Sequence, residues 1–379
     1  MPRHVLAILG LSIAALAFRA GEAARPAVRS YSTAEGLARD EVERVYFDSR
    51  GFLWVATDEG LSRFDGYRFV NYGTADGLPS DEVFSVEETA DGAYWVATGD
   101  GLCRFDPTSS EPSGPHPIFT RVSLAPAGDV GFSRVVRALR DDGRGGVWVG
   151  TGDGLVHLRA EGRAFTAERA DFGVKDAGYQ AEQINVIVSD PAGRIWVATR
   201  GLGVLRQRDG GWDRWTETDG LQSANVHALL ADDSGWVWIG GLSGIARLRA
   251  DAPPHARPDL VLTARDGLPS NDVRTLAFAG SGRLFVGTLL GMAEIAVGPS
   301  RTQVAVERRN VVPGGADAVI MSLAADQDHG LWIGTQGSGL LYLDLAGAVR
   351  FGVEDGLAST RVFALMNTSH GVAAIAGAD

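Results

Sequence analysis

The sequence contains a single cysteine, Cys103, among its 379 residues. One cysteine excludes an intrachain disulfide and every metal or redox site that is built on a cysteine pair. Cys103 stands in an apolar pattern, which predicts a small buried side chain. The sequence also lacks a basic block, because acidic and basic residues are interspersed and the net charge is −12. A nucleic-acid partner, which would need a basic stripe, is therefore not expected.

Long apolar runs are missing except at the N-terminus. Residues 5–18 form an apolar run that is too short to span a membrane comfortably. A short basic start, Arg3-His4, precedes the run, and Gly21 and Ala23 occupy positions that suit signal-peptide cleavage. We therefore expect residues 1–24 to be a signal peptide and the mature protein to be periplasmic. An uncleaved N-terminal anchor is the alternative.

Enzyme motifs are missing as well. The sequence has no His-Glu-x-x-His pair and no Gly-x-Ser-x-Gly elbow. The Gly-rich segments 150–154 and 334–339 lack the lysine and the following helix of a phosphate loop, so hairpin turns are expected there. Asp326-Gln327-Asp328 resembles the start of a calcium loop, but the later ligands do not follow. We expect no cofactor, no metal site and no catalytic residues.

The sequence is rich in glycine, with 50 residues, about twice the usual share. Such a content indicates many tight turns and therefore many short strands. An aromatic residue also recurs at intervals of 41 to 53 residues, and an eighth, weak copy places Ala374 at the same position. The seven aromatic residues are Trp54, Trp95, Trp148, Trp196, Trp238, Phe285 and Trp332.

The surroundings of this aromatic residue agree between the copies. Val or Ile stands twelve positions before it, Val, Leu or Ile nine positions before it, Val or Ile directly after it, and Ala or Gly two positions after it. We interpret each repeat as four short strands, a to d, with the aromatic residue on strand b. The large ring is expected to fill the space between sheets, and the small residue on the same face is expected to leave room for a neighbour's ring.

A second signature, Asp-Gly-Leu, precedes strand a at residues 76–78, 219–221, 266–268 and 355–357, and the first copy has Glu35-Gly36-Leu37. The acidic residue and Gly are expected to make the turn out of strand d, and Leu is expected to fill the interface between sheets. A period of about 40–50 residues with four strands each is typical of a propeller blade.

The predicted fold is therefore all-β. Residues 28–352 are expected to form a seven-bladed β-propeller of four-stranded antiparallel blades, with each repeat supplying its own four strands. Residues 353–379 are expected to be the partial start of an eighth repeat. They are either the beginning of a second propeller in a longer gene product or a degenerate tail.

Several segments resemble the two-component regulator propeller repeat family, namely residues 51–57, 60–65, 76–81 and 330–340. The resemblance covers nearly all of residues 28–379. It implies the periplasmic sensor region of bacterial hybrid two-component or diguanylate cyclase receptors, with carbohydrate fragments as the ligand class. In that family a β-sandwich, a membrane helix and an output module usually follow, and here they would lie beyond residue 379.

Blade topology places the b–c hairpins and the d–a connections on one face of the disc, where polar residues gather. The candidate ligand-binding residues on this face are Asp58, Asp100, Asp153, Arg200, Ser243, Gln336, Asn225 and Asn271. Acidic, amide and guanidinium groups together suit a hydroxyl-rich ligand. For any single one of these residues, a solvated turn is the favoured interpretation. Arg200 and Gln336 belong to hairpins one residue longer than the others and are expected to project furthest.

The function expected from the sequence is a periplasmic ligand-sensing propeller that binds a small polar or carbohydrate ligand and signals by contact or as a homodimer. One alternative is a secreted lyase or glycosidase, which for glycoside hydrolysis needs carboxylates about 5–10 Å apart. Another is a structural interaction platform. Trp212, Trp215 and Trp236 lie off the repeat position and suit either sugar stacking or, as the favoured interpretation, packing at blade edges.

Overall fold

The computed structural model describes residues 28–105, 118–124, 133–162, 164–174, 183–280, 282–297, 304–309, 318–327 and 330–345, and the strands 362–368 and 371–376. One compact unit is Val28–Ala346, and a second comprises Met1–Ala27 and Gly347–Asp379. The predicted signal peptide, residues 1–24, lies outside the described residues. Within the described part of the chain, no helix combines the length and the apolar character needed to cross a membrane.

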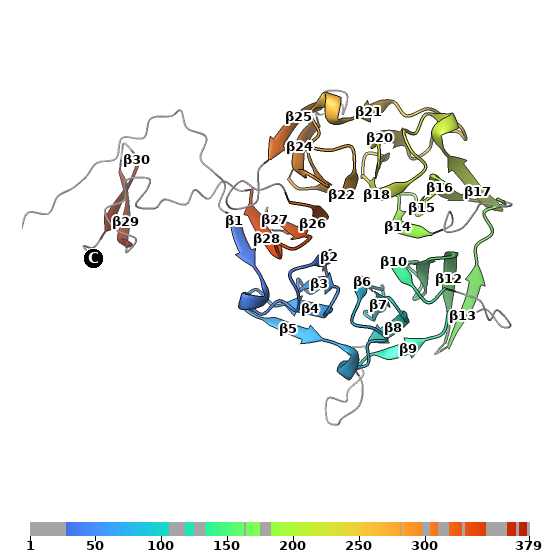
Figure 1. Cartoon of the computed structure of the whole chain (residues 1–379), viewed down its shortest axis with the longest axis horizontal. Helices are drawn as coiled ribbons and strands as arrows, with labels where there is room; N and C mark the ends of the chain where they lie inside the picture. Colours follow the sequence, from blue (N-terminus) through green and yellow to red (C-terminus); the bar gives the residue numbers. More distant parts are fainter. Residues whose placement is uncertain are drawn as a thin grey trace, which may run out of the picture. The chain divides into compact units, whose positions relative to one another are not determined.

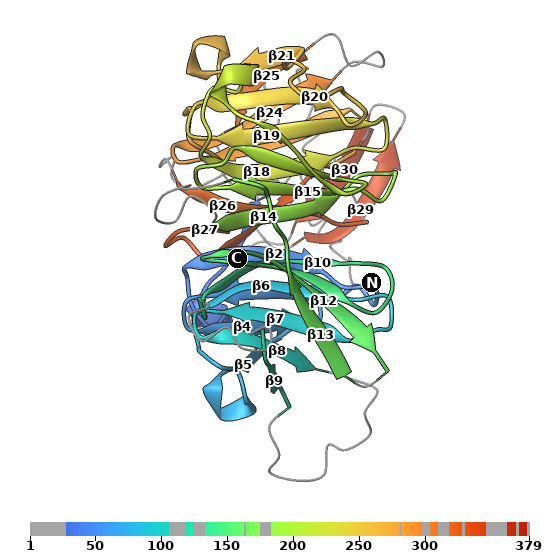
Figure 2. The same ribbon diagram turned by 90° about the vertical axis from the view of Figure 1, so that its right-hand side faces the viewer.

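Seven four-stranded antiparallel sheets form the unit Val28–Ala346 and stand around one axis as propeller blades (Figure 1). Figure 2 shows the same sheets from the side. From the axis outward, the first blade contains β2 (Val42–Phe47), β3 (Leu53–Thr57), β4 (Gly60–Phe64) and β5 (Phe69–Tyr72). The predicted all-β, seven-bladed fold is confirmed.

The next five blades repeat this order from the axis to the rim. The second and third contain β6 (Val83–Glu88), β7 (Tyr94–Thr98), β8 (Gly101–Phe105), β9 (Thr120–Val122), β10 (Val136–Asp141), β11 (Val147–Thr151), β12 (Gly154–Glu161) and β13 (Ala164–Arg169). The fourth, fifth and sixth contain β14 (Ile184–Ser189), β15 (Ile195–Thr199), β16 (Val204–Arg208), β17 (Gly211–Trp215), β18 (Val226–Ala231), β19 (Trp236–Gly241), β20 (Gly244–Arg249), β21 (Leu260–Leu262), β22 (Val273–Phe278), β23 (Arg283–Thr288), β24 (Gly291–Val297) and β25 (Val304–Arg309).

The seventh blade differs from the expectation that each repeat supplies its own four strands. It contains β26 (Ile320–Ala325), β27 (Gly330–Thr335) and β28 (Leu340–Asp344), and its outer strand is β1 (Val28–Tyr31) from the other end of the unit. Figure 1 shows the blue β1 beside the red β28. Pairing β1 with β28 covers the edge that the last repeat would otherwise leave open, and it closes the ring.

The repeat aromatics are buried between the blades, as predicted, and the most exposed of them, Trp332, keeps only 8% of its surface accessible. The small residue two positions on has a different partner from the one expected. A Cβ added at Gly150 would lie 2.6 Å from Cγ2 of Ile184, and one added at Gly240 would lie 2.6 Å from Cγ1 of Val273. The small residue therefore makes room for the branched residue that opens the next blade, and not for a ring.

An aspartate six positions before the tryptophan fixes both the a–b turn and the indole. In the first blade, Asp48 accepts hydrogen bonds from the backbone N–H groups of Arg50 and Phe52 and, at 2.8 Å, from the indole N–H of Trp54. Asp190, Asp232 and Asp326 accept the corresponding indole hydrogen bonds in their blades. Asp326 is thus a residue of the a–b turn.

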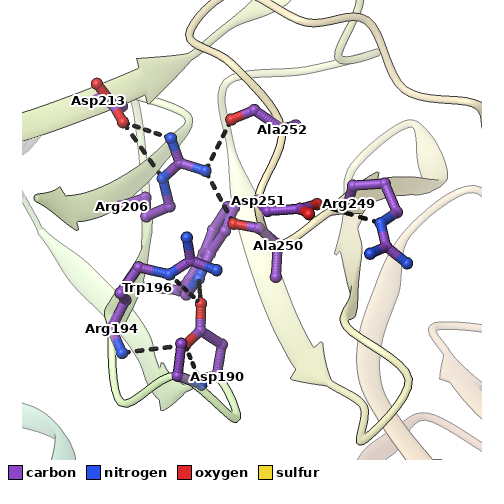
Figure 3. A network of polar contacts seen from close by, with 10 residues as sticks. Asp190, Arg194, Trp196, Arg206, Asp213, Arg249, Ala250, Asp251 and Ala252 are labelled. Carbon is purple, nitrogen blue, oxygen red and sulfur yellow. Dashed lines mark hydrogen bonds and ion pairs between the residues drawn. The ribbon is translucent and has the colours of Figure 1, made fainter.

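The residue paired with the tryptophan on strand c covers the indole face. In the fourth blade this residue is Arg206, which lies over the ring of Trp196 (Figure 3). It also lies over the ring of Trp215. Its guanidinium donates to Asp213 at 2.6 Å and to the carbonyl oxygens of Ala250 and Ala252 at 2.8 Å each. Since both carbonyl groups follow strand β20, this buried arginine ties the fourth blade to the fifth.

The Asp-Gly-Leu signature forms the predicted turn. Thr74–Asp76 is a short 3-10 helix, Gly77 adopts a left-handed φ of 101°, and Leu78 is buried. Cys103 is buried as predicted, and burial raises the pKa of its thiol to about 12.

In the second unit, β29 (Val362–Thr368) and β30 (Gly371–Ala376) form an antiparallel hairpin. Met366 pairs with Ala373, and in complete blades this pairing belongs to the aromatic position, so the expected alignment of Ala374 is wrong by one residue.

Candidate functional site

Every innermost strand of the propeller carries a β-bulge at its second residue. Between β2 and β3 the register shifts from Val42 to Arg44, which leaves Glu43 without a cross-strand partner. The same shift occurs in the other six blades. Bulges re-aim side chains, here toward the axis. The seven bulged residues, which we call the channel ring, are Glu43, Phe84, Arg137, Asn185, His227, Arg274 and Met321.

The channel ring lines a cavity of about 420 Å³ on the propeller axis, which we call the channel mouth. Arg44, Gln183, Arg200 and Asn225 complete its lining. Since Arg200 lies in a b–c hairpin and Gln183 and Asn225 lie in d–a connections, the channel mouth is on the face predicted for ligand binding. Its volume lies within the range of about 300–1,000 Å³ that small-molecule sites occupy.

Four arginines and one glutamate line the channel mouth. Arg274 pairs with Asp272 at 2.8 Å, and Nη1 of Arg200 lies 3.4 Å from Oε1 of Gln183. Arg137 lies over the ring of Phe84, with Cζ 4.4 Å from the centroid. Neither Arg44 nor Arg137 forms an ion pair with any residue that the structure describes. The lining is therefore polar and carries excess positive charge.

Two titratable groups of the channel ring respond to this environment. Burial lowers the pKa of His227, and the positive charges of Arg274 and Arg200 contribute in the same direction. His227 is consequently neutral near pH 7, with Nε2 2.8 Å from Oδ1 of Asn225. Burial raises the pKa of Glu43, which the charge of Arg137 partly offsets.

The structure brings together two of the eight sequence-predicted site residues, Arg200 and Asn225, in the channel mouth. The other six lie outside its lining. Asp100 pairs with Arg121 at 2.7 Å and with Arg134 at 3.4 Å. Asp100 is thus engaged by two arginines outside the lining of the channel mouth.

The remaining candidates also take part in local contacts. Asp58 lies 4.0 Å from Arg39, Asp153 accepts a hydrogen bond from the backbone of Ser133, and Asn271 accepts one from the backbone of Ala264. Gln336 forms an isolated β-bridge with Glu41, and Ser243 lines a separate, very small pocket of about 20 Å³.

The tryptophans off the repeat position lie at blade edges, as favoured from the sequence. Trp215 is fully buried and stacks on Trp196 with centroids 5.4 Å apart. Trp212 makes an edge contact with Trp148, and Trp236 lies beneath the guanidinium of Arg247 at 4.2 Å. None of these three lines the channel mouth.

Glu43 is the single carboxylate in the lining of the channel mouth, whereas glycoside hydrolysis requires a pair. Among the described residues, no group of three or more His, Cys, Asp or Glu side chains is placed to hold a metal ion. The chemistry that the lining does support is binding, by guanidinium, amide and imidazole groups around one cavity.

Solved structures with the same fold include the extracellular domains of two systems from B. thetaiotaomicron. The domain of the hybrid two-component system BT3049 is 20% identical, with a TM-score of 0.66 over 84% of this chain and 42% of that chain. The domain of the hybrid two-component system BT4673 is 16% identical, with a TM-score of 0.68 over 92% and 46%. This chain thus spans less than half the length of either structure.

Virginiamycin B lyase from Staphylococcus aureus, in a catalytically inactive form with quinupristin, is 9% identical, with a TM-score of 0.63 over 84% of this chain and 99% of that chain. No protein-family model matches this chain, and no curated protein matches it in sequence. At these identities the likenesses establish the propeller fold. They include extracellular domains of two-component systems, the class that the sequence resemblance predicted.

Proposed function

We propose that this chain is the periplasmic sensor propeller of a two-component type receptor and that it binds a small, hydroxyl-rich ligand in the channel mouth. The observation that carries the proposal is the channel ring. Directly before it along each innermost strand, Val or Ile recurs in every blade, because that residue packs between blades. The ring residue itself varies, with six residue types in seven blades and Arg alone occurring twice, so packing does not dictate it.

A ring of seven side chains of six different types around one cavity suits the recognition of an asymmetric ligand. Amide groups of Gln183, Asn185 and Asn225 offer both donors and acceptors, which hydroxyl groups require. The extracellular two-component domains with the same fold support a sensing role, and the predicted signal peptide supports export. The membrane helix and the output module belong to the same proposal.

A blocking variant tests the proposed site. Asn185→Trp introduces a bulky side chain into the channel mouth, and Gln222→Trp, at an exposed position, is the matched control. We expect a panel of plant and glycan oligosaccharides to contain members that raise the melting temperature of the native protein and of Gln222→Trp, and not that of Asn185→Trp.

Two results would overturn the proposal. One is a panel in which no member binds, and the other is undiminished binding to a folded Asn185→Trp variant. Mass spectrometry of the recovered ligand addresses the enzymatic alternative, because a lyase or glycosidase would return a cleaved product whereas a sensor returns the ligand intact.

A further inference from the structure

The charge of the channel mouth is opposite to that of the whole protein. The chain has a net charge of −12, yet four arginines line the channel mouth against the single carboxylate of Glu43. A narrow, low-dielectric cavity focuses such a field and attracts ligands of the opposite sign. The proposed function does not specify the charge of the ligand, and the positive charge of the channel mouth favours a negatively charged one.

The buried Arg206 has a structural role that Arg137 does not share. Arg206 is held by a carboxylate and two backbone carbonyl groups and covers two indoles. Arg137, by contrast, has the Phe84 ring as its close partner and no ion pair among the described residues. Stacking on Phe84 orients the guanidinium while its hydrogen-bonding groups remain available at the cavity.

Arg44 and Arg274 strengthen the same field. Arg44 lies one residue past the bulge of its strand and has no ion pair among the described residues. Arg274 pairs with Asp272 through Nη2, while its buried Nε has no hydrogen-bond partner. Cationic groups that are buried with few partners gain more from an incoming anion than well-paired ones do.

We infer that the channel mouth selects an anionic ligand, a hydroxylated carboxylate of the acidic-sugar type, and that Arg137 is its principal anion-binding residue. The inference rests on the proposed function and adds the ligand class. The planar guanidinium matches a carboxylate through two parallel hydrogen bonds, and the neighbouring amides suit the sugar hydroxyl groups. A sulfated sugar presents the same charge, and the experiment separates the two sources.

The probes are a galacturonic acid trimer, its carboxyl-reduced neutral counterpart, and a sulfated galactose disaccharide that has no carboxylate, alongside the neutral oligosaccharides of the panel. Calorimetry with the full chain measures their affinities for the native protein and three variants. Arg137→Gln removes the principal contact, Glu43→Gln removes the one opposing carboxylate, and Arg134→Gln is the control, a 75% exposed arginine on the same face outside the channel mouth.

We expect an acidic probe to bind more tightly than every neutral probe and to lose about ten- to a hundredfold in affinity in Arg137→Gln. The same probe should bind more tightly to Glu43→Gln and unchanged to Arg134→Gln. A structural role of Arg137 alone would not produce the opposite effect of Glu43→Gln. Preference for the galacturonate trimer identifies the carboxylate as the anion, whereas preference for the sulfated disaccharide alone contradicts that part of the inference.

The failures are distinguishable. If neutral and acidic probes bind equally and both are blocked by Asn185→Trp, the proposed function stands and the anionic inference is wrong. If an acidic probe binds but Arg137→Gln and Glu43→Gln leave its affinity unchanged, the anion binds elsewhere and the inference is also wrong. If no probe of either charge binds, both fail together.

Discussion

Replacing Asp213 by asparagine should destabilise the protein far more than the same change at Asp251, although both aspartates pair with an arginine near the junction of the fourth and fifth blades (Figure 3). The side chains of Arg206 and Asp213 are 8% and 6% exposed, whereas those of Arg249 and Asp251 are 46% and 68% exposed. Burial, and not the presence of an ion pair, should decide the effect.

The expected loss in the free energy of unfolding follows from the contacts that Arg206 keeps and loses in Asp213→Asn. Arg206 would keep its hydrogen bonds to the carbonyl groups of Ala250 and Ala252 but would lose its buried counter-charge. Breaking a buried pair by removing one partner costs about 3–5 kcal/mol, and the remaining amide oxygen favours the lower end, about 3 kcal/mol. A loss of that size lowers the ratio of folded to unfolded molecules more than a hundredfold.

Urea denaturation followed by tryptophan fluorescence measures the difference, since Trp196 and Trp215 lie against Arg206. Asp251→Asn should leave the midpoint unchanged, because solvent screens its pair. Arg206→Lys should behave like Asp213→Asn, because one ammonium cannot reproduce the fork that reaches Asp213 and both carbonyl groups. Equal midpoints for Asp213→Asn and Asp251→Asn would refute the claim that this buried pair ties the two blades.

Three further outcomes are expected. Trp54→Phe should destabilise the protein more than Trp95→Phe in chemical denaturation, because the indole N–H of Trp54 donates to buried Asp48 whereas that of Trp95 has no partner; the reverse order would contradict this account. Removal of residues 28–31 should lower the melting temperature and broaden the transition, because β28 then becomes an open edge, and an unchanged melting curve would show that β1 does not close the ring. The affinity for an acidic probe should rise as the pH falls from about 7 to about 5.5. Protonation of His227, whose pKa is lowered from 6.5, adds positive charge, and protonation of Glu43, whose pKa is raised, removes negative charge. The other charged groups that act on these two are Asp58, Glu82, Asp272, Arg44, Arg137, Arg200 and Arg274. The same lowered pKa of His227 has the opposite effect on stability, because a histidine whose folded pKa is depressed destabilises the fold as the pH falls below 6.5. Calorimetry across this range checks the rise in affinity, and thermal melts check the loss of stability. The double variant Glu43→Gln/His227→Gln should abolish the rise in affinity.

The blades were predictable because packing repeats in sequence. Val42, Trp54 and Ala56 recur in type at fixed spacing, since each blade must bury the same interface against the next. The predicted contact of the small residue was wrong because the pattern shows which residues are buried and not which of them touch. The actual partner of the small residue is the Val or Ile that stands twelve positions before the aromatic residue of the next blade, and this residue was part of the same repeated pattern.

The channel ring was not predicted because a bulge breaks the simple alternation of strand faces. Alternation from Val42 gives no reason to place Glu43 on the axis, and the register shift that turns it there leaves no mark in its own residue type. A signal did exist, in that the residues directly after the constant Val or Ile vary widely, with six residue types in the seven blades. Asn225 was grouped with Asn271, yet it lies one position later relative to its aromatic residue, and this places it at the channel mouth.

The strand β1 was overlooked for a related reason. Val28–Tyr31 precedes Glu35-Gly36-Leu37, the mark of a turn out of an outer strand, so the sequence held a strand d with no blade of its own. The seventh repeat, in turn, lacked an outer strand, and Val28–Tyr31 is the strand that fills this place. Neither segment alone has a distinctive pattern, and their pairing becomes evident when the ring is closed.

The pairing of β1 with β28 has a consequence for the order in which the protein folds. Val28 is synthesised early and lies opposite Leu343, which appears only after six blades have been completed. Contacts between such distant segments form slowly, and chains emerge from their N-terminal end. During synthesis β1 must therefore remain unpaired until β28 has been made, and in that interval proteases and chaperones have access to it.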